Sequence, residues 1–262
     1  IGAPGPRYSG TNVQVAGVDE PDVVKTDGEN IYYSTRPHNF SRPDFAGETH
    51  IIKAYPPEEL SLTSKIGFSG ELLFEDNILM VFSAGSIQAY DVSNPVEPRR
   101  SWLINLGKEL VGARLYADKL YVVLRERVDK HSPCPMLLAT FREKKIVEEC
   151  TNIYHPVTPV YVDRSYHILA VDPKSGEVVD KISFLGSSGR SIIYMSTNAI
   201  YITYPIQADP LKVFNNFFEV DCRDILPREM LDTLNQVLDY GMSAQAKLVE
   251  IQMVVSRYID SL

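Results

Sequence analysis

Short stretches of alternating polar and apolar residues fill most of the chain, and turn-forming residues bound each stretch. Four segments share a polar turn followed by an apolar run: DGENIYYS (27–34), EDNILMVFS (75–83), YADKLYVVL (116–124) and MSTNAIYIT (195–203). Each carries a pair of residues that supplies or tolerates positive φ between two strands, and these pairs are Asp27-Gly28, Asp76-Asn77, Asp118-Lys119 and Thr197-Asn198. The preceding strands are DVVKT, ELLFE, GARLY and SIIYM. The pattern therefore predicts a β-hairpin at each position.

A second element follows each of the first three hairpins. The segments 50–66, 86–104 and 166–184 each contain a strand, a polar turn rich in Pro, Asp, Asn or Gly, and another strand. Joining the two elements gives a unit of four antiparallel strands. The turn pairs lie 49, 42 and 79 residues apart, and the first two spacings fit the period of about 40–50 residues of propeller blades. The third spacing equals one blade plus an insertion.

We therefore predict an all-β fold with a helical insertion: a β-propeller of four-stranded antiparallel blades. About three blades and the start of a fourth lie in this chain. A β-sandwich also alternates short strands and turns, but it does not require the same pair of elements three times. We assign the blades to residues 1–210.

From about Leu211 the apolar period changes from two to 3.6, which predicts helices. One helical face carries Met230, Leu231, Leu234, Val237 and Leu238, and a second helix begins near Ser243. Pro227 is placed for a first turn and Gly241 for a C-terminal cap. Residues 211–262 are therefore expected to form a helical hairpin inserted in the propeller, just after the opening strands of the fourth blade.

Charge and hydropathy argue against binding to nucleic acid, binding to anionic lipid and spanning of a membrane. The net charge of −8 argues against binding to nucleic acid or to anionic lipid, since both need a basic face. A helix needs about 20 consecutive apolar residues to cross a bilayer, and the sequence contains no apolar run of nearly that length. We expect no nucleic-acid partner and no membrane span in this chain.

The three cysteines are Cys134, Cys150 and Cys222. The segment 134–150 is short and charged, and we expect a disulfide between Cys134 and Cys150 to close it as a loop inside the insertion. This would leave Cys222 free or paired outside the chain. A disulfide favours a location outside the cytosol, although intracellular proteins of hyperthermophiles are an exception.

The stretch TNVQVAGVDEPDVVKTDGENIYY (11–33) concentrates carboxylates around Lys25. Asp19, Glu20 and Asp22 do not have the spacing of an EF-hand, yet Asp side chains with loop carbonyls could hold Ca²⁺. The competing interpretation is structural. Asp and Pro would stop an N-terminal strand, TNVQVAGV, which closes the ring by pairing with the last blade, and Asp27-Gly28 would form the first hairpin turn. The residues favour the structural interpretation, and Asp19, Glu20 and Asp22 are kept as a candidate calcium site, calcium being the only candidate cofactor.

Other motifs are weak. The five histidines form no metal-binding spacing, and His155 stands in a loop rich in Tyr and Pro that could line an exposed face. GSSGRS (186–191) lacks the lysine and following helix of a phosphate loop, so we expect it to join two blades. Catalytic residues remain unknown.

The same opening stretch resembles a family of secreted, mainly archaeal and bacterial proteins with a predicted C-terminal β-propeller domain. The resemblance continues through LYVV (120–123), CTNIYHPVTPVYVDRSYHILAVDPKSGEV (150–178) and the helical insertion with LP at its start. It implies an extracellular or cell-surface location and a longer domain. It implies no established activity, so no catalytic residue is carried over.

We expect a binding or scaffolding module, with a surface protein or glycan as partner. The alternative is a secreted, hydrolase-like enzyme with its site in the central channel; a structural surface-layer component is a third. Three blades and part of a fourth cannot close a ring. The remaining blades of the same propeller are therefore expected as a partner, supplied either by a C-terminal part of a longer protein or by a second chain.

Overall fold

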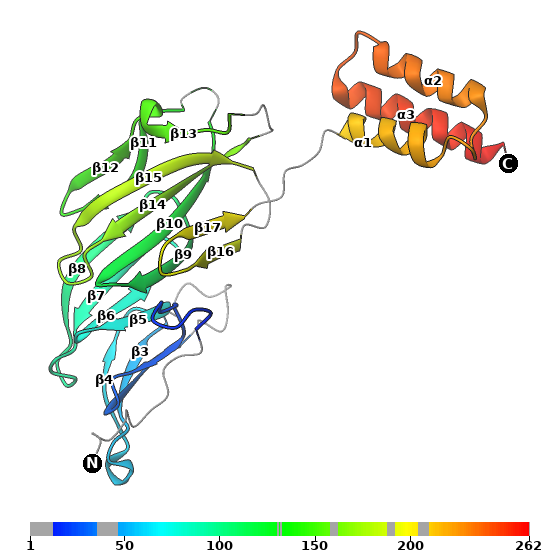
Figure 1. Cartoon of the computed structure of the whole chain (residues 1–262). Coiled ribbons are helices and arrows are strands. Elements are labelled where there is room, and N and C mark those ends of the chain that lie inside the picture. The colour runs from blue at the N-terminus through cyan, green and yellow to red at the C-terminus, as the bar shows by residue number, and fades with distance from the viewer. Residues whose placement is uncertain are drawn as a thin grey trace. The chain divides into compact units, whose positions relative to one another are not determined.

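The computed structural model describes residues 13–35, 47–129, 131, 133–157, 162–187, 192–203 and 210–261. The chain divides into two compact units, residues 1–205 and 206–262. The first consists of β-strands and the second of helices, as Figure 1 shows. Each unit has a hydrophobic core of its own.

The first blade is a meander of four strands: β1 (Val24–Thr26), β2 (Asn30–Ser34), β3 (Thr49–Lys53) and β4 (Ser61–Ile66). All neighbours in it are antiparallel. The alternation of the sequence places every second side chain on one face, so Tyr32, Ile51 and Ile66 are buried together. Blade one is therefore the four-stranded unit that the sequence predicts.

The second and third blades repeat this order. Blade two contains β5 (Glu71–Glu75), β6 (Ile78–Phe82), β7 (Ser86–Asp91) and β8 (Arg99–Leu106). Blade three contains β9 (Glu109–Tyr116), β10 (Lys119–Arg127), β14 (Arg164–Val171) and β15 (Val178–Gly186). The largest core cluster joins side chains of both blades, among them Leu73, Trp102, Leu120 and Leu169. Packing of one sheet face on the next therefore holds the blades together.

The connection from β10 to β14 contains the predicted insertion, but it is not a loop. Residues 134–150 form a hairpin of β11 (Met136–Phe141) and β12 (Lys144–Glu148), and β11 pairs with β8. Blade two thereby becomes six strands wide. A short strand, β13 (Ile153–Tyr154), then pairs parallel with β15. The hairpin arises because LLATF and KKIVE are two strand-forming runs around a turn at Arg142 and Glu143, both with positive φ.

The tight turns lie where the sequence predicts them except for a shift of one residue in blade three, but neither Thr197 nor Asn198 adopts a positive φ. Asp76 and Asn77 both have positive φ, as a type I′ turn requires. In blade three, however, Ala117 and Asp118 take the two positive φ values, and Lys119 already begins β10. The prediction of Asp118-Lys119 is therefore wrong by one residue, because an Asp tolerates left-handed backbone at either turn position.

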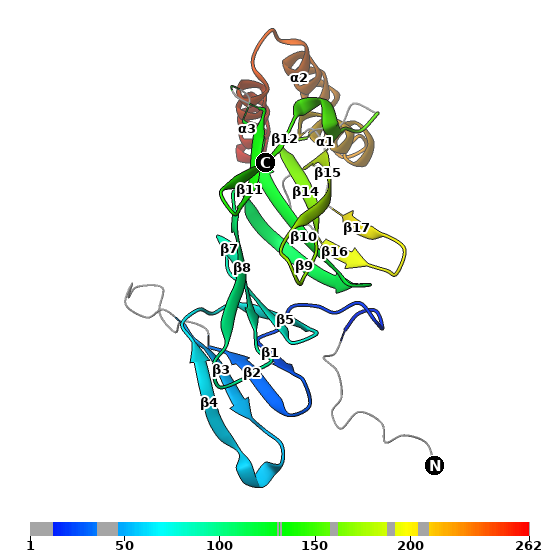
Figure 2. The same ribbon diagram turned by 90° about the vertical axis from the view of Figure 1, so that its left-hand side faces the viewer.

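A fourth sheet has two strands within the described residues, β16 (Ile192–Met195) and β17 (Ile200–Thr203). Figures 1 and 2 both show this hairpin beside β9 of blade three. The segment GSSGRS precedes it, and residues 188–191 of that segment lie outside the described part of the chain.

The helical unit has one helix more than the predicted hairpin. Helices α2 (Arg228–Asp239) and α3 (Ala244–Asp260) match the predicted pair, and the Ser243 side chain caps α3 by accepting from Ala246 N. Before them lie α1 (Pro210–Asn216) and a π-helical segment, Phe217–Asp221. The sequence pattern did not predict α1 as a separate helix, because it has only seven residues and Val213 and Phe214 are exposed. Met230, Leu231, Leu234 and Val237 form the core of this unit with Phe218 and Ile251.

The predicted N-terminal strand TNVQVAGV is wrong in its described part. Residues 13–18 form bends and a turn, and the following residues form isolated bridges in place of a ladder. Gly17 adopts φ +84°, which ends any extended run before Val18. The second half of the stretch, DVVKTDGENIYY, does form the first hairpin of blade one.

Candidate functional site

A single segment, residues 18–23, lies along the free edges of two blades; we call it the edge strap. Asp19 exchanges two backbone hydrogen bonds with Leu115 of β9, at 2.8 and 3.0 Å. Asp22 does the same with Leu72 of β5, at 3.1 and 2.6 Å. Both β5 and β9 are the first strands of their sheets. Since one short segment reaches both, these edges converge, as the inner edges of neighbouring propeller blades do.

The edge strap is held by ion pairs. The side chain of Lys25 in β1 is only 4% exposed, and its Nζ lies 2.7 Å from Asp19 Oδ1 and 2.7 Å from the carbonyl oxygen of Glu20. Glu20 Oε1 lies 3.3 Å from Nε of Arg114 in β9, and Arg114 Nη2 donates to the carbonyl of Ile193 in β16 at 3.5 Å. The strap thus connects all four sheets through backbone or side-chain contacts.

The three predicted calcium ligands do not converge. Asp19 faces Lys25, Glu20 faces Arg114, and Asp22 Oδ1 accepts from the amide of Val23 at 2.6 Å. Across the described residues, no three side chains of His, Cys, Asp or Glu are grouped so as to hold a metal ion. The ammonium of Lys25 supplies the positive charge beside Asp19. Asp19, Glu20 and Asp22 therefore have no convergent ligand set in the described residues, and they remain an untested candidate for calcium.

Asp27 acts as a turn residue, as expected. Its Oδ1 accepts from the amides of Glu29 and Asn30 at 2.9 and 2.6 Å, and its Oδ2 accepts from the Tyr32 hydroxyl at 2.7 Å. Burial raises the pKa of Asp27, but the hydrogen bonds from Asn30, Tyr32 and Glu29 outweigh it and hold the pKa below its usual value. The charge therefore stabilises the first hairpin.

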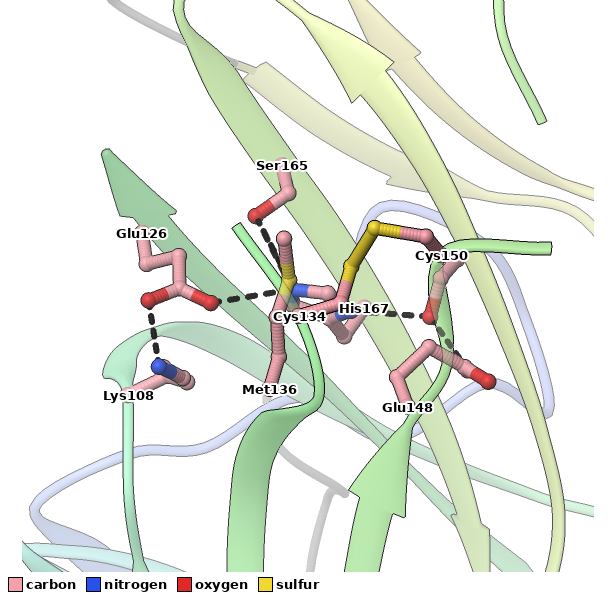
Figure 3. A network of polar contacts seen from close by, with 9 residues as sticks. Lys108, Glu126, Cys134, Met136, Glu148, Cys150, Ser165 and His167 are labelled. Atoms are coloured by element: carbon pink, nitrogen blue, oxygen red, sulfur yellow. Dashed lines mark hydrogen bonds and ion pairs between the residues drawn. A yellow bond between two sulfur atoms is a disulfide. The ribbon is translucent and has the colours of Figure 1, made fainter. Parts of the chain in front are cut away.

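A buried polar network lies where β11 and β12 meet blade three, as Figure 3 shows. His167 of β14 is 0% exposed; its Nδ1 lies 2.8 Å from Ser183 Oγ and its Nε2 3.0 Å from Ser165 Oγ. Ser183 donates to Glu148 Oε2 at 2.7 Å. Because that hydroxyl is the donor to Glu148, Nδ1 of His167 donates to Ser183.

An ion pair between a glutamate and a lysine lies at each end of this network. Glu148 of β12 is 2% exposed and lies 2.5 Å from Lys181 Nζ. Burial raises the pKa of Glu148, but hydrogen bonds from Lys181 and Ser183 bring it below the usual value. At the other end Glu126 pairs with Lys108, and its Oε1 lies 3.8 Å from His167 Nε2.

These residue types resemble acid–base machinery, but Ser165, His167 and Ser183 are each 0% exposed. A reacting substrate needs contact with its catalytic groups, so the network is structural. It joins the hairpin to blade three, because buried polar groups require partners from the facing sheet. The sequence pattern did not predict this network. Its signal is present in RSYHILAV, where Ser165 and His167 continue the buried face of Leu169 and Val171.

The disulfide lies beside the network. Cys134 and Cys150 are bonded, with Cα atoms 5.6 Å apart, at the two ends of the hairpin. Figure 3 shows the pair next to His167 and Glu148. Cys222 of the helical unit is free. The bond therefore fastens the same hairpin that the network fastens.

A polar groove of about 610 Å³ borders this network, and Glu148 and Lys181 of the network are among its lining residues. Its walls are the turn Cys150–Asn152, β13 and β15, and its lining includes Asn152, Tyr154, Asp180 and Lys181. Tyr154 is 67% exposed, so its ring is available to a ligand. The neighbouring His155 is exposed and its Nδ1 lies 3.0 Å from the Pro156 carbonyl oxygen. It does not line this groove.

A second acidic group lies at the hairpin turns of blades two and three. Asp76 pairs with Lys174 at 2.9 Å. Burial, followed by the charges of Asp118 and Asp76, raises the pKa of Glu75 to about 6. Glu75 and Asp76 belong to blade two and Asp118 belongs to blade three. The fold, and not one sequence motif, therefore brings these carboxylates together.

Comparisons with known proteins agree with this architecture. The family model described as a beta propeller domain matches residues 8–253. An uncharacterised protein of Archaeoglobus fulgidus is 42% identical over 255 residues, covering 96% of this chain and 40% of its own length. An uncharacterised protein of Methanocaldococcus jannaschii is 32% identical over 263 residues, covering 98% and 39%. The chain thus spans about two fifths of the length of these relatives.

Among solved structures, an acylaminoacyl peptidase of Pyrococcus horikoshii aligns with a TM-score of 0.42 and 14% identity, over 73% of this chain and 28% of its own. A likeness this distant carries no inference about activity. Within the described ranges, none of the helices combines the length and the apolar content that a bilayer crossing requires. Repeated four-stranded sheets and a family match over most of the chain lead to one conclusion: the chain belongs to the beta propeller domain family.

Proposed function

We propose that this chain is part of an extracellular or cell-surface β-propeller that serves as a binding or scaffolding module. The observation that carries the proposal is the polar groove of about 610 Å³ beside the disulfide-bonded hairpin. It combines an exposed aromatic ring, Tyr154, with the amide of Asn152 and the charges of Asp180 and Lys181. Sites of this composition orient a polar ligand by a few fixed groups.

Two polar side chains of the groove are held by one buried carboxylate. Lys181 is held by the buried carboxylate of Glu148, and Asn152 Nδ2 donates to the same carboxylate at 3.4 Å. A preorganised site loses less entropy on binding. We therefore propose a surface glycan or the polar surface of another envelope protein as the partner.

The proposed location rests on the disulfide, since such bonds persist mainly outside the cytosol. The alternative of a secreted, hydrolase-like enzyme with a site in the central channel is not favoured. At the edge strap, the charged groups Asp19, Lys25, Glu20 and Arg114 are engaged with one another, and the acid–base residues around His167 are buried.

A binding assay on isolated cell envelopes tests the proposal. Purified chain is sedimented with envelope polysaccharide and, separately, with surface-layer protein. We expect saturable binding to one of them that Tyr154→Ala and Asn152→Ala weaken, whereas Val96→Ala, at an exposed turn of blade two, does not. Equal binding by all variants would show that the groove is not the binding site. Recovery of the native protein from the cytosolic fraction with reduced cysteines would exclude the location.

A further inference from the structure

We propose that the outward face of α3 is a docking surface for the same helix of a second copy of this chain, and that the two helices pair antiparallel. The face is defined by Val249, Glu250, Met253 and Arg257. It belongs to the helical unit alone, and the proposal concerns self-association, so it does not depend on the groove of the strand unit.

Helix α3 has apolar side chains on two sides, and only one side packs into the core of its own unit. Ile251 is 3% exposed in that core, and Val255 and Tyr258 pack against it. Val249 and Met253 are one turn apart on the other side, and they are 46% and 43% exposed. The helix therefore keeps an apolar strip that its own unit does not cover.

Charged residues flank this strip on one edge. With a rotation of about 100° per residue, Glu250 and Arg257 lie on the same edge beside Met253, two turns and about 10 Å apart along the axis. In the described part of the chain, neither of these two side chains has an ion pair or a side-chain hydrogen bond. The opposite edge carries Gln252 and Ser256, which are exposed and uncharged. Two opposite charges without partners thus lie on one edge of the strip.

A second copy of α3 supplies the complementary charges. In an antiparallel pair about a two-fold axis beside Met253, Glu250 of one copy lies opposite Arg257 of the other, and the symmetry repeats this contact. Two ion pairs then form along one side of the dimer, and the Met253 side chains of both copies meet at the axis. A parallel pair would instead turn each charged edge toward Gln252 and Ser256 of the other copy. The charge pattern therefore selects a second copy as the occupant and fixes its direction.

The association should be weak. Helix α3 has 17 residues and is about 25 Å long, and a single pair of such helices buries less than the about 1,200–2,000 Å² of a stable interface. We expect a dissociation constant in the micromolar range that rises with salt concentration, because exposed ion pairs are screened.

Sedimentation equilibrium tests the charge pattern. The purified chain is compared with Glu250→Arg, with Arg257→Glu and with the variant that carries both changes. Each single change sets like charges against each other in both symmetric contacts, so we expect the dissociation constant to rise about tenfold. The double change restores both ion pairs and should restore wild-type affinity. The matched control is Val220→Ser, which removes a side chain that is 66% exposed elsewhere in the same unit and should leave the affinity unchanged.

Oxidative cross-linking tests the direction of pairing, in a Cys222→Ser background. Met253→Cys should form a disulfide between two copies, because the two positions meet at the axis. Val249→Cys should not, since its two copies lie about 13 Å apart along an antiparallel pair, beyond the about 7 Å that a disulfide can bridge.

Three results overturn the proposal. One is a double change that associates no better than the single changes. Another is Val249→Cys cross-linking as readily as Met253→Cys, which would mean a parallel pair. The third is a chain that stays monomeric at micromolar concentrations. Maleimide labelling of Met253→Cys then identifies the alternative: slow labelling would assign the face to another part of the same chain, and fast labelling would show that the face is free.

Discussion

The Nζ atom of Lys25 lies 2.7 Å from Oδ1 of Asp19, so a lysine in the first strand of blade one fixes the segment that pairs with blades two and three. Lys25→Met should destabilise the strand unit by about 1–3 kcal/mol, less than for a fully buried pair because the Asp19 side chain is 31% exposed. Urea unfolding measures the change.

The control for this prediction is Lys53→Met, which removes the exposed pair with Glu59. Exposed pairs contribute only about 0–1 kcal/mol. If the two variants unfold at the same urea concentration, the Lys25 pair does not have the role assigned to it.

Calcium should have no effect on the stability of this chain. Lys25 already neutralises Asp19, and the three candidate carboxylates face different partners. We expect equal melting temperatures in excess calcium chloride and in EDTA. A calcium-dependent increase that Asp19→Asn or Asp22→Asn abolishes would instead show that the opening acids bind the ion.

Loss of the disulfide should destabilise the strand unit. Cys134 and Cys150 are 16 positions apart, and closing a loop of this length contributes about 3 kcal/mol. We expect the double variant to serine at both positions to melt at a lower temperature, and reductant to slow the wild-type chain on a denaturing gel. Cys222→Ser is the control, since Cys222 is free. Unchanged migration together with thiol labelling at both positions would contradict the bond.

Glu75 should make stability depend on pH. Its folded-state pKa is raised from 4.5 to about 6, so the folded state binds the proton more tightly than the unfolded state does. Its contribution is fully present below pH 4.5 and is lost as the pH rises through about 6. Glu75→Gln should therefore raise the melting temperature at neutral pH and leave it unchanged below pH 4.5. Glu71→Gln, on the same strand, is the control. A stabilisation that is equal at both pH values would rule out the ionisation of Glu75 as its cause.

Gly176 should tolerate no side chain. It adopts φ +76°, and an added Cβ would lie 2.7 Å from Cδ2 of Trp102. The left-handed backbone alone costs a non-glycine residue about 1–3 kcal/mol. Gly176→Ala should lower the unfolding midpoint and change the fluorescence of Trp102, the single tryptophan, whose indole donates to Pro173 at 2.9 Å. Gly85→Ala, with open space around it, should do neither. Wild-type stability and emission in Gly176→Ala would contradict the packing.

The sequence by itself determined the blades. Period-two alternation and turn pairs such as Asp76-Asn77 are local properties, because strand faces and hairpin turns depend on a few adjacent residues. The same holds for α2 and α3, whose apolar residues recur at helical spacing.

The tertiary structure decided the features that depend on contacts between residues distant in the sequence. Residues 13–18 have an alternating sequence but form no strand, and Asp19 and Asp22 bond to β9 and β5 one residue at a time. Glu148 and His167 belong to different sheets and are linked through Ser183, because the pairing of β11 with β8 brings β12 beside blade three. A carboxylate can bind a cation, form a turn or bond to a buried serine. Which of these it does depends on the partner that the fold brings within hydrogen-bond distance.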